Sequence, residues 1–267
     1  VDAPDLWAWR NTVFIFEDEA RPGELAGIPM QAGDSDDFEN FTLKEKQVQI
    51  RYLEDTLKTL LAKPQTLKRD KKLAEVYADL GRLYASRGSF DEAFDYLERS
   101  KAISVSTGDQ KGIAYAYNNI GLIYRSRGDF ELALNHFKKS LEISQLLLNH
   151  RESAGVNNNI GLMYFDHGDY ETAMKAFKKS LKFIRKIGDK VGEVHVLNNI
   201  AHVLHVLGEF DRALELLEKS LTISREIGSK SAEGATLNNI SQVYFARGDY
   251  EFALKSLKKS TKRPANI

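Results

Sequence analysis

The chain has 267 residues, of which 42% are hydrophobic and 28% are charged, and its formal net charge is zero. This composition is that of a water-soluble protein, long enough for one large domain or for an array of repeats. The absence of cysteine excludes disulfides, thiolate metal sites and thiol redox chemistry. No apolar run approaches the roughly 20 residues needed to cross a bilayer, and no signal-peptide pattern opens the chain. We therefore expect a cytoplasmic protein without membrane contacts.

Residues 1–41 form an acidic segment that differs from the rest of the chain. Ten acidic and two basic residues precede Leu43, a net charge of −8, so the remainder carries +8. The stretch WAWRNTVFIFEDE predicts an extended, strand-like segment, and the acid-rich, Gly- and Pro-containing residues after it predict a loop. Because opposite charges attract, we expect DSDDFENF to lie against the basic remainder, with Phe38 and Phe41 as apolar anchors. The alternative is that Trp7, Trp9, Phe14 and Phe16 cover the end of repeat one or belong to a neighbouring domain.

An amphipathic helix is predicted next, over residues 42–63. It begins TLKEKQVQ, in which Thr42 and Glu45 have the spacing of a capping box. Pro64 ends it because proline cannot continue a helix. We expect this helix to pack on the first repeat and to cover its apolar face.

Five repeats with a period of forty follow, over about residues 70–262. The segments RGSFDEAFDYLERS, RGDFELALNHFKKS, HGDYETAMKAFKKS, LGEFDRALELLEKS and RGDYEFALKSLKKS each end in serine, the last at Ser260. A second helical stretch precedes each segment, so each unit is helix, glycine-containing turn, helix, and a period of this length predicts a solenoid. The expected repeats are about 70–108, 109–148, 149–188, 189–228 and 229–262, with a tail at 263–267.

The repeats share small, aromatic, turn and closing positions. The first helix carries a small residue at Gly81, Gly121, Gly161, Ala201 and Ser241, and an aromatic residue three positions later in every repeat except at Leu204. The turn carries a glycine at Gly88, Gly128, Gly168, Gly208 and Gly248. The second helix carries an alanine at Ala93, Ala133, Ala173, Ala213 and Ala253. This pattern resembles the tetratricopeptide repeat, in the long variant of bacterial regulators and of scaffold proteins similar to kinesin light chain. The resemblance implies an all-α fold, a right-handed α-solenoid superhelix of five helix-turn-helix repeats.

Two rows of asparagine recur in the first helices of repeats two to five. One row is Asn118, Asn158, Asn198 and Asn238, and the other is Asn119, Asn159, Asn199 and Asn239. Asparagine is a poor helix former, and the helical period turns these positions away from the hairpin partner, so we expect them on the inner surface, where amides could bond a partner's peptide groups. The resemblance implies the same use. The alternative is a structural ladder that joins neighbouring repeats.

Other side chains share the predicted peptide-binding face. They are Tyr115, Leu122, Arg125, Leu162, Phe165, His195, His202, His205, Gln242 and Phe245, a mixture that suits a partly apolar peptide. The three histidines lie near one helix face and could suggest zinc, but they lack a carboxylate at a suitable spacing. We interpret them as part of a polar surface. If they have a function, we expect a pH-sensitive contact in which the imidazoles become charged near pH 6.5.

The sequence carries no phosphate loop, dinucleotide fingerprint or nucleophile motif, so we expect no enzyme activity in this chain and no cofactor. Lysines at the ends of the second helices complement the helix dipole and do not predict nucleic-acid binding. The predicted function is a protein-interaction scaffold or sensor that binds an extended peptide, or its own acidic segment. The alternative is the regulatory arm of a larger signalling enzyme. The uncovered last helix predicts either a longer chain or a dimer through the last repeat.

Overall fold

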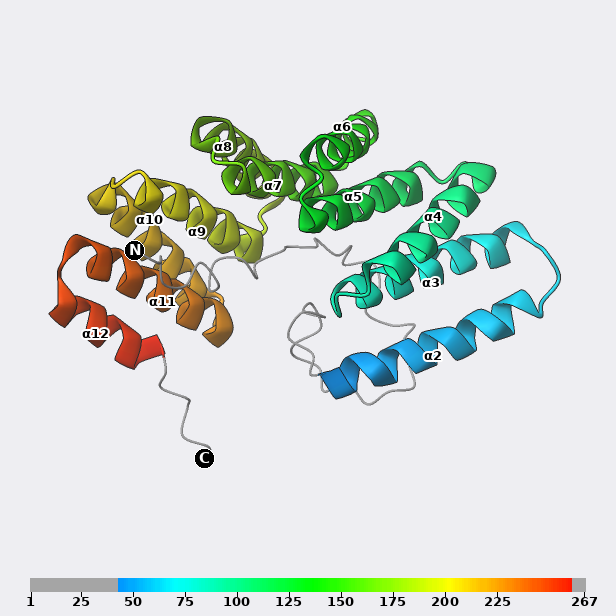
Figure 1. Cartoon of the computed structure of the whole chain (residues 1–267), viewed down its shortest axis with the longest axis horizontal. Helices are drawn as coiled ribbons and strands as arrows, with labels where there is room; N and C mark the ends of the chain where they lie inside the picture. Colours follow the sequence, from blue (N-terminus) through cyan, green and yellow to red (C-terminus); the bar gives the residue numbers. More distant parts are fainter. Residues whose placement is uncertain (1–42, 261–267) are drawn as a thin grey trace. The chain divides into compact units, whose positions relative to one another are not determined.

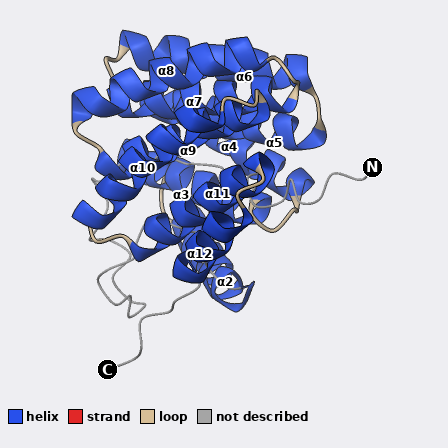
Figure 2. Ribbon diagram, turned by 90° about the vertical axis from the view of Figure 1, so that its left-hand side faces the viewer, coloured by secondary structure: helices blue, strands red, loops and turns tan. Residues whose placement is uncertain are grey.

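The computed structural model describes residues 43–260, and these residues form eleven α-helices joined by short turns (Figures 1 and 2). The strand-like segment and the docking contact predicted for residues 1–41 lie outside the described residues. In chain order the helices are α2 (Leu43–Leu61), α3 (Leu67–Ala85), α4 (Phe90–Thr107), α5 (Gln110–Arg127), α6 (Phe130–Leu146), α7 (His150–Asp166), α8 (Tyr170–Ile187), α9 (Lys190–Val206), α10 (Phe210–Glu226), α11 (Lys230–Arg247) and α12 (Tyr250–Ser260).

Consecutive helices pack as antiparallel hairpins. Helix α3 packs on α4, α5 on α6, α9 on α10 and α11 on α12. Within one unit, the second helix of a repeat also contacts the first helix of the next repeat, as α4 does with α5, α8 with α9 and α10 with α11. First helices of the same unit also contact one another, α3 with α5 and α9 with α11. The prediction of an all-α array of helix-turn-helix repeats is confirmed.

The small residues of the first helices let each hairpin close tightly. A Cβ atom on Gly121 would lie 2.7 Å from the Phe137 ring, and one on Gly161 would lie 2.6 Å from the Phe177 ring. Both rings are almost completely buried. Glycine is therefore required at these positions because any larger side chain would displace the aromatic core of the hairpin.

Glycines with positive φ form the turns inside every hairpin, from Gly88 (φ 80°) to Gly248 (φ 90°). A second series, which the sequence pattern did not single out, forms the turns between repeats at Gly108, Gly188 and Gly228. Between repeats two and three the corresponding residue is Leu148, at φ 53°. A left-handed backbone is unfavourable for leucine, so this turn is strained compared with its three counterparts.

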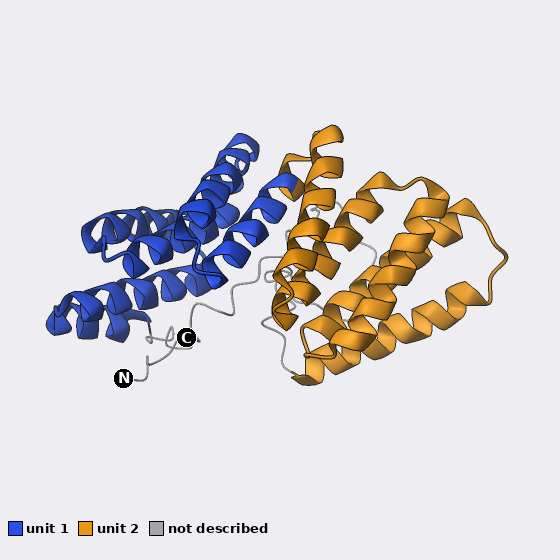
Figure 3. Cartoon of the chain, turned by 45° about the horizontal axis from the view of Figure 1, so that its top comes forward, with its two compact units in different colours: residues 1–14, 153–267 blue, residues 15–152 orange. Residues whose placement is uncertain are grey.

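The chain divides into two compact units, which are described separately (Figure 3). The described part of one, here the N-terminal unit, is residues 43–152, and that of the other, the C-terminal unit, is residues 153–260. In the N-terminal unit, Ile50 and Leu53 of α2 are buried against Val76 and Leu80 of α3. Helix α2 therefore covers the apolar side of the first repeat.

Candidate functional site

The residues of the predicted peptide-binding face lie in both units. Helix α5 of the N-terminal unit carries Tyr115, Asn118, Asn119 and Arg125. Helices α7, α9 and α11 of the C-terminal unit carry Asn158, Asn159 and Phe165; Asn198, Asn199 and His202; Asn238, Asn239 and Gln242. The rest of the predicted face is Leu122 on α5 and, in the C-terminal unit, Leu162, His195, His205 and Phe245. The C-terminal unit thus supplies thirteen of the eighteen predicted residues, and the geometry of the site is clearest there.

The asparagine rows lie between helices, not on the surface. Seven of the eight predicted asparagines are buried, and Asn158 and Asn159 have no exposed surface at all. Only Asn238 is half-buried. A buried amide must find hydrogen-bond partners inside the protein or lose free energy. The burial therefore favours the structural alternative for seven of these residues.

Asn198 joins three helices through a hydrogen-bonded triad. Its Nδ2 donates to Oγ1 of Thr236 on α11 (3.2 Å), and its Oδ1 accepts from Oγ of Ser220 on α10 (3.0 Å). The two hydroxyl oxygens lie 3.2 Å apart. All three side chains are buried, so the triad fixes how α9, α10 and α11 meet.

A second amide link joins α7 to α9. Asn199 Nδ2 donates to Oδ1 of Asn158 at 2.8 Å. The Nδ2 group of Asn158 is buried and has no hydrogen-bond partner. The residue at the place of Thr236, one repeat earlier, is Val196, which has no hydroxyl. In the N-terminal unit, Asn119 Nδ2 instead donates to the Tyr115 carbonyl of its own helix (2.9 Å).

A row of aromatic and imidazole rings runs across the C-terminal unit. The Phe165 ring lies 4.4 Å from His202 and 5.4 Å from Tyr170, measured between centroids. His202 lies 6.3 Å from His205, which lies 5.9 Å from Phe210. We call these five residues the imidazole–aromatic row. His202 is buried, and the other four are half-buried, so the row presents ring edges and faces at the surface.

The histidines of α9 are held neutral. Burial lowers the pKa of both His195 and His202 to about 3, and it also lowers the pKa of His205. The expectation of a charge that appears near pH 6.5 is therefore wrong for the free protein, because a buried imidazolium would lose its hydration. In residues 43–260 no group of three or more His, Asp or Glu side chains could hold a metal ion.

Helix α11 extends this face with exposed groups. Asn238 and Gln242 are half-buried, and Phe245 is 62% exposed, with its ring 5.4 Å from that of Tyr250. Phe245 and Tyr250 thus form a pair of exposed aromatic rings where α11 ends and α12 begins.

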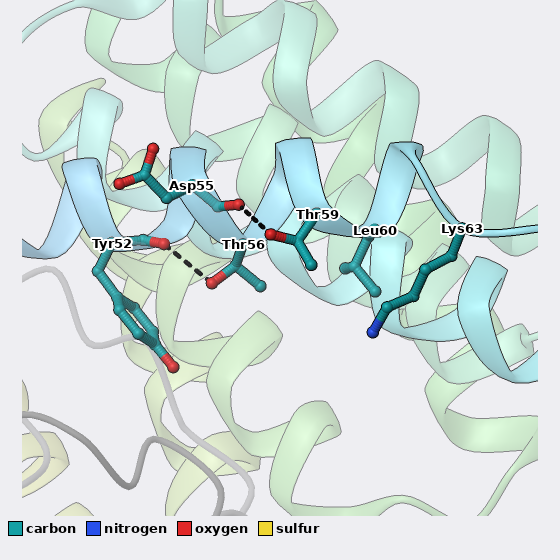
Figure 4. A pocket seen from close by; sticks show the side chains of 6 residues that line it. All are labelled: Tyr52, Asp55, Thr56, Thr59, Leu60 and Lys63. Atoms are coloured by element: carbon teal, nitrogen blue, oxygen red, sulfur yellow. Dashed lines mark hydrogen bonds between the residues drawn. The ribbon is translucent and has the colours of Figure 1, made fainter.

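The pockets of the described residues include two shallow ones. The first lies on α2 and has a volume of about 280 Å³ (Figure 4). Its two threonine hydroxyls donate to backbone carbonyls of the same helix, Thr56 to Tyr52 and Thr59 to Asp55. The second, about 380 Å³, lies in the C-terminal unit beside Tyr170, Met174 and Leu204. No helix in residues 43–260 is long and apolar enough to cross a membrane.

Comparison with known proteins agrees with this architecture. A family model described as tetratricopeptide repeat matches residues 112–186 and 192–264, and a second model of the same description matches residues 73–107. No curated protein sequence matches the chain significantly.

Several solved structures share the fold. BtubC (BKLC) from P. vanneervenii is 18% identical with a TM-score of 0.68, and the match covers 83% of this chain and 95% of that one. A Rap protein complexed with competence and sporulation factor is 14% identical (TM-score 0.66, 80% and 57% covered). A STAND signal-transduction ATPase with a tetratricopeptide repeat sensor, from Pyrococcus horikoshii, is 22% identical with a TM-score of 0.65. The match covers 82% of this chain and 35% of that one.

Proposed function

Since the chain belongs to the tetratricopeptide repeat family, whose domains are in general protein-interaction modules, we propose that it is a scaffold or sensor that binds an extended segment of a partner protein. The proposed binding face is formed by α7, α9 and α11 of the C-terminal unit. The observation that carries the proposal is the imidazole–aromatic row, continued by the exposed Phe245 on α11.

The chemistry of this face selects a mostly uncharged, apolar partner segment. Aromatic rings supply large contact areas at a low cost in side-chain entropy. Because burial keeps the imidazoles of His202 and His205 neutral, these two rings add no net charge to the face. Asn238 and Gln242 are half-buried, and their amides match the hydrogen-bonding groups of an extended backbone.

The buried asparagines have an indirect part in this proposal. The Asn198 triad and the link between Asn199 and Asn158 hold the helices at the spacing that places the rings side by side. Of the eight asparagines, we therefore propose that Asn238, which is half-buried, contacts the partner. The Rap protein with competence and sporulation factor bound supports the idea that this fold accommodates such a ligand.

Two further interactions of this chain belong to the same proposal: docking of its own acidic segment on the face, and a dimer. The chain's own acidic segment, residues 1–41, is tethered and so has a high effective concentration. Deleting it should strengthen partner binding if it competes for the face, and it should leave the affinity unchanged if it does not. A dimer through α12, on which Phe252 and Leu254 are half exposed, would appear as a doubled mass in analytical ultracentrifugation.

The regulatory arm of a larger signalling enzyme remains the alternative. It is supported by the fold shared with a repeat sensor that belongs to a STAND ATPase, of which this chain covers 35%. The mass of the natural gene product distinguishes the two: a mass close to the 30.2 kDa of this chain favours a separate scaffold.

Selection from a random peptide library tests the proposed function. Peptides would be selected on the full chain and then tested against the variant Phe165→Ala. We expect enrichment of uncharged sequences that contain aromatic or aliphatic residues, with weaker binding to the variant. A matched control is Lys178→Ala, an exposed residue on α8. The proposal fails if no sequence is enriched, or if the enriched peptides bind both variants as tightly as the parent chain.

A further inference from the structure

An aromatic cluster of the N-terminal unit carries two lysines and a histidine. The Tyr117 ring on α5 lies 5.6 Å from the His136 ring on α6, which lies 5.2 Å from Tyr124. The Nζ atoms of Lys101 on α4 and Lys139 on α6 lie 5.3 and 5.4 Å from the centre of the Tyr117 ring. We call these five residues the Tyr117 cluster. No part of it belongs to the proposed peptide-binding face.

The Tyr117 cluster has an excess of positive charge. The ammonium groups of Lys101 and Lys139 both approach the Tyr117 ring. The distance between their Nζ atoms is therefore at most the sum of their distances to the ring centre. Lys101 pairs with Glu98 at 2.5 Å. Lys139, by contrast, has no carboxylate partner among residues 43–260, and its ring contact supplies only part of what a counter-ion would.

His136 adds a hydrogen-bond donor to this positive region. The side chain is half-buried, and its Nδ1 is buried without a hydrogen-bond partner. A buried acceptor without a partner costs less than a buried N–H without one, so the favoured tautomer carries its proton on Nε2, at the open edge of the ring. Burial and the two lysines lower the pKa of His136, so the imidazole stays neutral and donates one N–H.

The preceding repeat provides a natural comparison. There Arg99 lies 5.9 Å from the Tyr77 ring, in the position that Lys139 has beside Tyr117. The residue equivalent to His136 is Tyr96, which stacks on Tyr84, and the Tyr84 hydroxyl donates to Glu54 (2.9 Å). This first cluster has an aromatic ring in place of the imidazole, and Tyr77 has one cation where Tyr117 has two. The contacts of this first cluster are therefore accounted for by side-chain packing and one hydrogen bond.

We propose that the Tyr117 cluster binds one phosphate group, with Lys101, Lys139 and His136 as donors. A phosphate monoester carries a charge of about −1.5 to −2 near neutral pH and three strong acceptor oxygens, which matches two ammonium groups and one N–H. A carboxylate brings a single charge, and Glu98 already supplies one to Lys101. The phosphate is either free in solution or carried by a phosphorylated side chain, and the same donors serve both.

Nuclear magnetic resonance of the His136 ring tests this site in the full chain. The ring signals, assigned by their loss in His136→Gln, would be followed at pH 7.5 during additions of sodium phosphate, O-phosphoserine, O-phosphotyrosine or sodium acetate at constant ionic strength. We expect saturable shifts with the phosphate compounds. Lys139→Met should weaken binding roughly fivefold, which corresponds to about 1 kcal/mol, whereas Lys138→Met, which removes the neighbouring exposed lysine, should leave it within a factor of two.

Each outcome decides a part of the proposal. Tighter binding of a phosphorylated amino acid than of inorganic phosphate assigns the site to a modified partner, and the reverse assigns it to free phosphate. Shifts that do not saturate, equal effects of Lys138→Met and Lys139→Met, or binding of acetate as tight as that of phosphate would each overturn the proposal. Circular dichroism of the variants should show unchanged helix content, because both lysines are exposed.

Discussion

Replacing Asn198 with alanine should destabilise the protein substantially. The substitution removes one hydrogen bond donated to Thr236 and one accepted from Ser220, each worth about 1 kcal/mol net. The two hydroxyls remain 3.2 Å apart and can still pair, which limits the penalty for leaving them buried. The space left by the amide adds a cavity cost. We therefore expect a loss of roughly 2–3 kcal/mol in the free energy of unfolding.

Urea unfolding followed by circular dichroism measures this loss as a lower midpoint. The matched control is Asn238→Ala, at the same place in the last repeat, where the amide is half-buried. We expect that substitution to cost less than about 0.5 kcal/mol, as most surface changes do. If Asn198→Ala unfolds within about 0.5 kcal/mol of the parent chain, the triad is not a structural link and the reasoning from burial is wrong.

Three further predictions concern stability. Val196→Thr should raise the free energy of unfolding by about 1 kcal/mol, because the hydroxyl would accept from the unpaired Nδ2 of Asn158; a lower urea midpoint would show that the hydroxyl finds no partner. Leu148→Gly should raise the melting temperature, since φ is 53° there and glycine removes a strain of roughly 1–2 kcal/mol, partly offset by its greater freedom when unfolded; an unchanged or lower melting temperature would refute the strain. The folded pKa of His202, about 3, lies below its unfolded value, so its contribution to stability is complete above about pH 6.5 and falls as the pH drops. This residue should make the free energy of unfolding roughly 2 kcal/mol lower at pH 5 than above pH 6.5. The variant His202→Gln should lose that part of the pH dependence.

The fold could be predicted from the sequence because its signals are local and periodic. The forty-residue repeat, the turn glycine and the small residue opposite an aromatic each specify one contact, and Gly121 against Phe137 is an example. The turns between repeats were not singled out, since Leu148 interrupts the series of Gly108, Gly188 and Gly228.

The candidate site was harder to predict, because the helical period gives the direction of a side chain but not its depth. It places Asn158 and Asn198 on one face of their helices, yet the neighbouring helices approach closely enough to bury both. Thr236 accepts a hydrogen bond from Asn198 only because α11 places it beside that amide, which the helical period does not reveal. The equivalent residues of earlier repeats, Val156 and Val196, have no hydroxyl, so the repeat pattern does not indicate this contact. The lowered pKa values of the α9 histidines follow from the same burial.

The affinity of one selected peptide for a set of variants tests the central claim most directly. Titration calorimetry would compare the parent chain with Phe165→Ala, Phe245→Ala and the control Lys178→Ala. If the face of α7, α9 and α11 binds the partner, each aromatic truncation should weaken binding about tenfold or more, as loss of an interface aromatic often does, while the control stays within a factor of two. Equal affinities for the parent chain and both aromatic variants would contradict the account.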